Sequence, residues 1–186
     1  MILVTGFEPF AGASINPSGE IAKRLHIEGV VTAVLPVTYN GATKALLDLI
    51  EEHKPKAVVC LGLAEGRTTI SFEQVAINLD DAALADNGGE TRSGQPISPD
   101  GETAYFTTLP IRELVEALKA EAIPASVSLS AGVFVCNHIF YELQKTLVGT
   151  AIPSGFVHVP LLETMPLENQ VRAISLTLEA LRKVIA

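Results

Sequence analysis

Residues 130–138 read SAGVFVCNH, and at this stretch a short apolar run changes into an amphipathic helix. The run Ala125–Leu129 before it has the length and composition of a strand, and from Cys136 to Leu147 the apolar residues recur with the helical period. A strand that leads into a helix is the repeating unit of α/β folds. The same alternation extends along the chain on both sides of this junction.

The other predicted elements follow from the same patterns. Further strands are predicted at Ile2–Phe7, Val30–Val37, Lys56–Leu61, Ile70–Leu79 and Gly155–Val159. Helices are predicted from Asn16 as N-cap with Pro17 at the first position, from Asn40, over Ile111–Glu121 and over Leu167–Ile185. The alternation predicts an α/β fold, a three-layer α/β/α sandwich around a twisted, largely parallel mixed sheet.

Length and composition limit the classes of protein. With 186 residues and 48% hydrophobic content, we expect one domain, residues 1–186, with a full core. The formal net charge of -8 argues against nucleic acid and anionic membranes as partners. Two cysteines without a framework spacing, and a start without a signal-like apolar segment, predict a cytoplasmic protein.

The polar segment Asp80–Glu102 interrupts the alternation. It holds four glycines and two prolines and lies well inside the chain. A segment of this length without evident structure is often functional, or forms an excursion such as a hairpin or a lid. We expect one of these here.

Cys136 is the candidate nucleophile. At the start of a helix a thiol lies beside unpaired backbone N–H groups, which favour the thiolate and can also bind an oxyanion. Cys60 lies within an apolar run and is interpreted as a core residue.

A nucleophilic cysteine needs a base, and the chain has four histidines. His138 is two positions further along the helix, which turns its side chain about 200° away from Cys136. His26 and His53 are predicted near helix ends and are interpreted as surface residues. His158 lies at the end of a strand, where ligands of parallel α/β sheets bind, and is the candidate base; a core histidine is the alternative.

The base must itself be oriented, usually by a carboxylate. If Ile70–Leu79 is a regular strand, Glu73 shares a face with apolar residues, where a carboxylate is costly unless it is paired. His158 would be a suitable partner. The alternative is that the strand is bulged or lies at an edge, so that Glu73 reaches water.

Several blocks of the sequence, taken in order, resemble pyroglutamyl peptidase I, a family of cysteine peptidases. They are Gly6–Phe10, Asn16–Ser18, Gly62–Arg67, Glu73–Asn78, Ala131–Gly132 with Val135–Asn137, and Gly155–Pro160. The resemblance extends over nearly the whole chain and implies that Cys136 is the nucleophile, His158 the base and then the acid, and Glu73 the group that orients His158.

The implied activity is removal of N-terminal pyroglutamyl residues from peptides through a thioester, without a metal or an organic cofactor. The implied partners are peptides with N-terminal pyroglutamate, and the family commonly assembles as a homotetramer. Pyroglutamate is a small, flat lactam without a charged amine, so its pocket needs apolar faces and a few amide-like partners.

By resemblance, Phe7 and Phe10 sandwich the lactam, Asn16 lies nearby, and Leu63 and Val135 form walls or backbone contacts. Without the resemblance, both phenylalanines would be interpreted as ordinary core residues.

One departure from the family pattern leaves other functions open. Residues 81–87 read DAALADN where the family commonly has DARxPDN, so Ala83 replaces an arginine proposed to lie near the oxyanion. A weakened homologue that binds a lactam without turnover is therefore one alternative. A nucleoside phosphorylase on a similar fold is another, although Arg67 and Arg92 give it little support.

Overall fold

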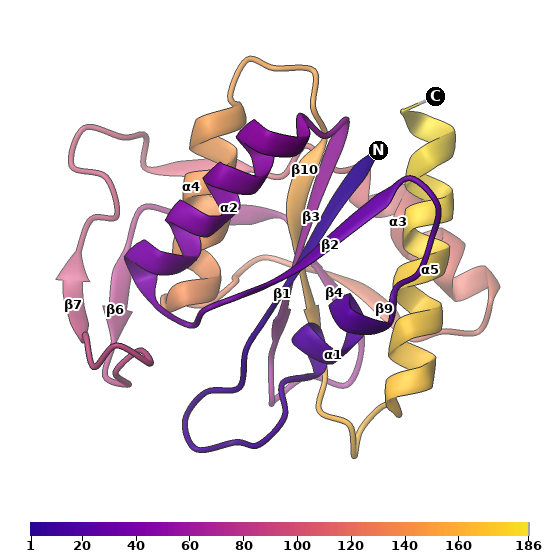
Figure 1. Ribbon diagram of the computed structural model, residues 1–186, viewed down its shortest axis with the longest axis horizontal. Coiled ribbons are helices and arrows are strands. Elements are labelled where there is room, and N and C mark those ends of the chain that lie inside the picture. The colour runs from indigo at the N-terminus through magenta and orange to yellow at the C-terminus, as the bar shows by residue number, and fades with distance from the viewer. Residues whose placement is uncertain (186) are drawn as a thin grey trace.

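The computed structural model describes residues 1–185, and a six-stranded sheet lies at its centre (Figure 1). In spatial order the strands are β2 (Val30–Leu35), β1 (Ile2–Phe7), β3 (Ala57–Leu63), β10 (Ser154–Val159), β4 (Ile70–Glu73) and β9 (Ala125–Ser128). The first four are parallel to one another, β4 is antiparallel to β10, and β9 is parallel to β4. The sheet is therefore mixed and largely parallel, as the sequence predicted.

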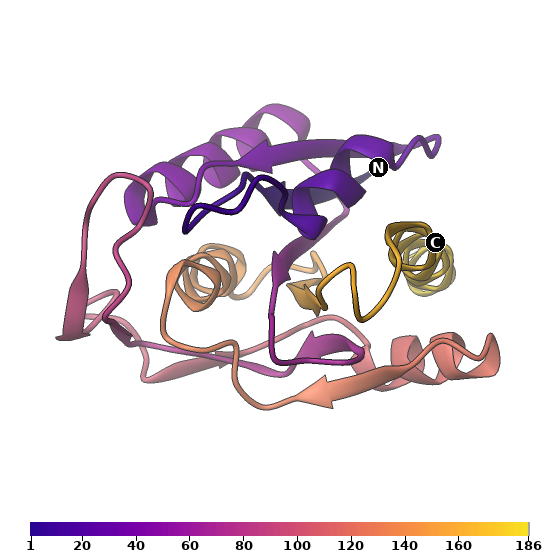
Figure 2. The same ribbon diagram turned by 90° about the horizontal axis from the view of Figure 1, so that it is seen from below.

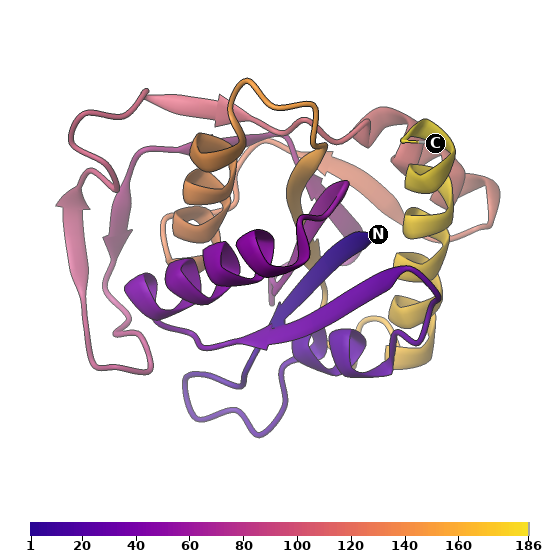
Figure 3. The ribbon, with the colours of Figure 1, turned by 45° about the horizontal axis from the view of Figure 1, so that its top comes forward.

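Within residues 1–185, five helices cover the two faces of this sheet. They are α1 (Pro17–Arg24), α2 (Tyr39–His53), α3 (Ile111–Ala120), α4 (Val135–Leu147) and α5 (Leu167–Val184). One buried apolar cluster joins α2 and α4 to the sheet, and a second joins α1, α3 and α5 to it. Figure 2 shows α4 and α5 end-on, on either side of β10, and Figure 3 shows α2 beside α4. The predicted three-layer arrangement is confirmed.

Helix starts illustrate what local sequence can and cannot show. Asn16 caps α1 as predicted, because its Oδ1 accepts from the backbone N–H of Ser18 at 3.1 Å. The start of α2 was placed wrongly at Asn40, since the helix begins at Tyr39. Its first N–H donates to Oδ2 of Asp86, at 3.1 Å, so the cap comes from a distant segment.

The predicted strand Ile70–Leu79 is broken at Gln74. Only β4 joins the central sheet, whereas the following residues form small antiparallel pairs. These pairs are β5 (Val75–Ile77) with β8 (Ala104–Phe106), and β6 (Asp80–Ala82) with β7 (Arg92–Gln95). The polar segment Asp80–Glu102 is therefore a hairpin excursion, seen beside α2 and α4 in Figure 1.

A buried amide of α4 holds the residues that lead from β5 into the excursion. Nδ2 of Asn137 donates to the carbonyl oxygens of Ile77 and Leu79, at 2.9 and 3.1 Å, and its Oδ1 accepts from the N–H of Ile77 at 3.0 Å. Asn137 directly follows Cys136, so these bonds also fix the first turn of α4.

Candidate active site

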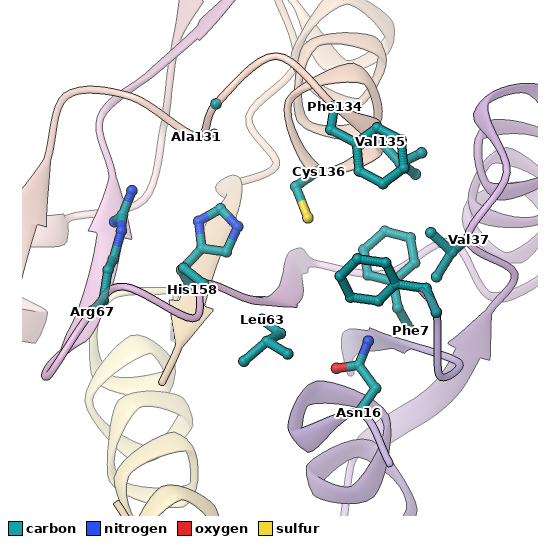
Figure 4. A pocket seen from close by; sticks show the side chains of 13 residues that line it. Phe7, Asn16, Val37, Leu63, Arg67, Ala131, Phe134, Val135, Cys136 and His158 are labelled. Atoms are coloured by element: carbon teal, nitrogen blue, oxygen red, sulfur yellow. The ribbon is translucent and has the colours of Figure 1, made fainter. Parts of the chain in front are cut away.

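Cys136 lies in the first turn of α4, one residue after the helix begins. The N-cap residue, Phe134, has no side-chain hydrogen bond to this turn, so the first N–H groups of the helix are left for another acceptor. The sulfur points into a cavity beside β3 (Figure 4). A Cβ at Gly62 would lie 2.9 Å from this sulfur, so a glycine is needed at that position of β3.

His158 and Glu73 form a buried pair on the neighbouring strands. Nδ1 of His158 lies 2.7 Å from Oε1 of Glu73, whose side chain is completely buried. The strand register places Ser71 opposite His158, so Glu73 reaches the imidazole diagonally across one face of the sheet. Because an ionised carboxylate only accepts, Nδ1 carries the proton and Nε2 is left as an acceptor. Figure 4 shows the imidazole beside the sulfur of Cys136.

Burial favours the neutral forms of both the thiol and the imidazole. Burial, followed by the negative charge of Glu73, raises the pKa of the Cys136 thiol to about 12, although Arg67 acts in the opposite direction. Burial also lowers the pKa of His158, although Glu73 opposes this shift. Desolvation therefore opposes the stabilisation of a thiolate that we expect from the helix N-terminus.

The sulfur of Cys136 and the imidazole of His158 border one small cavity, whose wall is largely apolar. Its volume is about 240 Å³. Seven of the eight residues predicted for the site line it: Phe7, Phe10, Asn16, Leu63, Val135, Cys136 and His158. The eighth, Glu73, lies behind the imidazole. The structure thus brings together side chains that the sequence places in six separate segments.

The aromatic wall has a buried and a partly exposed member. Phe7 is 2% exposed and packs against Phe156, with 6.5 Å between ring centroids. Phe10 is on the loop between β1 and α1 and packs against Phe134 at 6.3 Å. Asn16 lies at the end of this loop, and its Nδ2 donates to the carbonyl of Glu8 at 2.9 Å.

A family model described as pyroglutamyl peptidase matches residues 1–185. The chain belongs to the pyroglutamyl peptidase family. The resemblance found in the sequence is confirmed, and with it the assignment to the cysteine peptidases, a class of hydrolases.

Relatives of this pyroglutamyl peptidase family member match along nearly its whole length. A pyrrolidone-carboxylate peptidase of Gloeobacter violaceus is 44% identical, with 97% of this chain and 96% of the relative covered. That of Bacillus thuringiensis is 42% identical, with 99% and 88% covered.

Solved structures carry the same fold. The crystal structure of Bacillus amyloliquefaciens pyroglutamyl peptidase I has a TM-score of 0.93 at 36% identity and covers 97% of this chain and 95% of its own. A mutant pyrrolidone carboxyl peptidase of Pyrococcus furiosus also gives 0.93 at 36% identity, with 100% and 99% covered.

Sequence reasoning missed several residues that line the cavity of this pyroglutamyl peptidase family member. They are Val37, Ala64, Arg67, Ala131, Gly132 and Phe134. Phe134 lies within the stretch that marked the nucleophile, and Arg67 closes the block Gly62–Arg67, so proximity to recognised motifs was the signal available. The role of Arg67 as the ionic partner of Glu73 was not predicted.

The other histidines lie away from the sulfur. Nδ1 of His138 is 2.8 Å from Oδ2 of Asp80, and the ring borders a second hollow between α2, α4 and the excursion. The helical argument that turned His138 away from Cys136 is thus confirmed. His26 is exposed beyond the end of α1, and His53 is the last residue of α2.

Ala83 follows β6 on the excursion, where it is exposed. It is not among the residues that line the cavity. The next part of the excursion does reach the site, since Nδ2 of Asn87 donates to Oε1 of Glu8 at 2.8 Å and to the carbonyl of Pro9 at 2.9 Å. The excursion therefore braces the loop that carries Phe10.

Residues 1–185 also lack two kinds of feature. Within that range no helix is long and apolar enough to cross a membrane. Nor do three or more histidine, cysteine, aspartate or glutamate side chains gather there as a candidate metal-binding group.

Proposed function

We propose that the protein is a cysteine exopeptidase that removes N-terminal pyroglutamyl residues from peptides. The observation that carries the proposal is the meeting of Cys136 and the His158–Glu73 pair at one small, largely apolar cavity. Membership of the pyroglutamyl peptidase family supports it. The roles of nucleophile, base and orienting carboxylate fall to Cys136, His158 and Glu73.

The reaction begins from a neutral thiol and a neutral imidazole. Nε2 of His158 takes the thiol proton as the sulfur of Cys136 attacks the carbonyl carbon that joins pyroglutamate to the next residue. Glu73 holds the ring in the required tautomer and stabilises the imidazolium that forms. His158 then gives this proton to the leaving amine, and a thioester remains on Cys136.

Hydrolysis of the thioester repeats the same proton transfers with water. His158 removes a proton from the water molecule as it attacks the carbonyl carbon and returns it to the departing sulfur. Pyroglutamate leaves and the neutral thiol is restored. The residues of the triad therefore supply the acid and base functions of both half-reactions.

The first turn of α4 is the candidate oxyanion site. Its backbone N–H groups are free of a side-chain cap, and the N-terminal end of the helix dipole favours negative charge. In serine peptidases one oxyanion-hole donor contributes about 3 kcal/mol to transition-state stabilisation. The backbone N–H of Cys136 is such a donor, and it does not require an arginine at the position of Ala83.

The cavity accounts for the choice of pyroglutamate. Phe7 and Phe10 offer flat apolar faces to the lactam, and Leu63 and Val135 limit its length. Asn16 has its Oδ1 occupied in capping α1, so the second N–H of Nδ2 is the group left for the lactam carbonyl. A free α-ammonium group, as in glutamyl or prolyl peptides, would enter an apolar site without a carboxylate to pair with.

We propose further that residues 1–186 act as one peptidase domain in the cytoplasm, on peptides and not on nucleic acid or membranes. The net charge of -8 supports the exclusion of polyanionic partners. A homo-oligomer, a tetramer by resemblance to the family, completes the proposal. The chemistry above needs no metal or organic cofactor.

The test compares hydrolysis of pyroglutamyl, prolyl and glutamyl reporter amides by the purified protein. We expect the ratio kcat/KM for the pyroglutamyl amide to exceed the other two by about 10³-fold or more, because the site rejects a buried unpaired charge. Saturable binding of pyroglutamate without release of the reporter would instead identify a lactam-binding homologue. Phosphate-dependent cleavage of a nucleoside would identify a phosphorylase.

A further inference from the structure

Arg67 links two parts of the candidate site that come from distant segments. It lies on the loop that follows β3, on the His158 side of the cavity and across from Phe7 and Val37 (Figure 4). Its Nη1 lies 2.7 Å from Oε1 of Glu73, and its Nη2 donates to the carbonyl oxygen of Ser130 at 2.7 Å. One guanidinium thus joins the carboxylate of the triad to the loop that leads into Cys136.

Glu73 depends on this contact for its charge balance. Its side chain is completely buried, and Oε1 lies 2.7 Å from both the His158 imidazole and the Arg67 guanidinium. Within residues 1–185, Oε2 has no hydrogen-bond partner. Since the imidazole is neutral at rest, Arg67 is the group that compensates the buried negative charge.

We infer that Arg67 is a positioning residue of the peptidase reaction, which holds the Glu73 carboxylate and the Ser130 loop in place relative to each other. This inference rests on the proposed function. It assigns two separable tasks to Arg67. Its positive charge acts on His158 through Glu73, and its second N–H fixes the loop.

The charge task has a defined sign. The ionisable groups facing His158 are Glu73 from β4, Arg67 from the loop after β3 and Cys136 from α4, with Cys60 of β3 close to Cys136. Burial lowers the pKa of His158, Glu73 raises it, and Arg67 lowers it. Removing the positive charge of Arg67 therefore raises the pKa of His158. The base is then lost to protonation at a higher pH.

The loop task depends on the shape of the side chain. A lysine keeps the positive charge but lacks the planar fork that reaches two acceptors at once. Arg67→Lys therefore preserves the effect on His158 while it releases the carbonyl of Ser130. Arg67→Gln removes the charge and breaks the ion pair with Glu73.

The experiment measures kcat/KM for a pyroglutamyl reporter amide from pH 5 to 9 in the wild type, Arg67→Gln and Arg67→Lys. We expect the acid limb of Arg67→Gln to move to higher pH by roughly one unit, because the protonated imidazole no longer has a like charge nearby. Arg67→Lys should keep the acid limb of the wild-type pH profile. Its kcat should fall about tenfold, because the Ser130 loop that leads into Cys136 is less well placed. Arg112→Gln, at an exposed position of α3, is the matched control.

A second measurement does not depend on turnover. In the Cys136→Ala background, the proton NMR titration of His158 should move to higher pH when Arg67→Gln is added, with His158→Gln used to assign the signal. An unchanged titration and an unchanged acid limb in Arg67→Gln, with an active wild type, would overturn the inference. An inactive wild type would instead overturn the proposed function on which it rests.

Discussion

On one side of the cavity, Cys136 and His158 project from the first turn of a helix and from a central strand, and their geometry is fixed by buried packing. On the other side, Phe10 projects from a loop whose next five residues are all exposed. That loop is held by polar contacts from the excursion, through Asn87. The reacting groups are thus on rigid elements, whereas part of the recognition surface depends on a few hydrogen bonds. Changes on the two sides should therefore affect different kinetic constants.

The largest effect is expected at the nucleophile. Cys136→Ala should lower kcat for a pyroglutamyl reporter amide by at least about 10⁴-fold, because no thioester can form. Cys60→Ala is the matched control, since Cys60 is buried in the core under the same helix. It should keep turnover and lower the free energy of unfolding by about 1 kcal/mol. Retained hydrolysis by Cys136→Ala would end the peptidase proposal.

Glu73 should come next. Glu73→Gln should reduce kcat by about 10²- to 10⁴-fold, because the amide can donate to Nδ1 of His158 and so favours the wrong tautomer. Glu116→Gln, which changes an exposed carboxylate on α3, should leave kcat unchanged. Steady-state kinetics at saturating substrate provide the measurement. Equal rates for Glu73→Gln and the wild type would show that His158 does not rely on this carboxylate.

The aromatic wall should change binding and not the chemical step. Phe10→Ala should raise KM about tenfold with kcat within about twofold, because it removes an apolar face from the lactam. Phe7→Ala should instead lower the free energy of unfolding by about 3–5 kcal/mol, since Phe7 lies in the core. Denaturant unfolding and steady-state kinetics distinguish the two. A fall in kcat in Phe10→Ala without a change in KM would contradict the division between the two sides.

The brace on the Phe10 loop should have a smaller effect. Asn87→Ala removes the bonds to Glu8 and Pro9 and should raise KM about fivefold, the value of roughly one hydrogen bond, with kcat unchanged. Asn169→Ala, at an exposed position of α5, is the control. If KM stays the same in Asn87→Ala, the excursion does not support the recognition surface.

The smallest effect concerns pH. Because burial lowers the pKa of His158 from its ordinary 6.5, the imidazole stays neutral as the pH falls to that value and gains a proton only below it. We therefore expect kcat/KM of the wild type to change by less than about twofold from pH 7.5 to 6.5, and to fall at lower pH. A pH–rate profile measures this directly. If kcat/KM already fell by half above pH 6.5, the pKa of the base would not be lowered by burial, and the expectation would be wrong.

Much of the fold was predictable because it depends on short-range patterns in the sequence. Asn16 and Pro17 predicted the start of α1, and Ile2–Phe7 is a strand with the predicted bounds. The break at Gln74 was not predicted, because nothing local marks the residue at which the chain leaves the central sheet for β5. The start of α2 was misplaced because its cap, Asp86, is far away in the sequence.

For the site, residue chemistry pointed to Cys136 and His158, and the cost of an unpaired buried carboxylate pointed to Glu73. The sequence shows the thiol at a helix N-terminus, but it does not show how much of the surrounding surface is covered, and that burial raises the pKa of the thiol.

The sequence by itself determined most of the alternation of strands and helices along the chain, the family and the residue types available for chemistry, because periodicity, capping and motifs are local properties. Only the tertiary structure decided which of these residues meet. The diagonal from Glu73 to His158, the bridge from Arg67 to Ser130 and the brace from Asn87 to the Phe10 loop all join segments far apart in the chain. Such contacts arise from sheet register and packing, which depend on the whole chain at once.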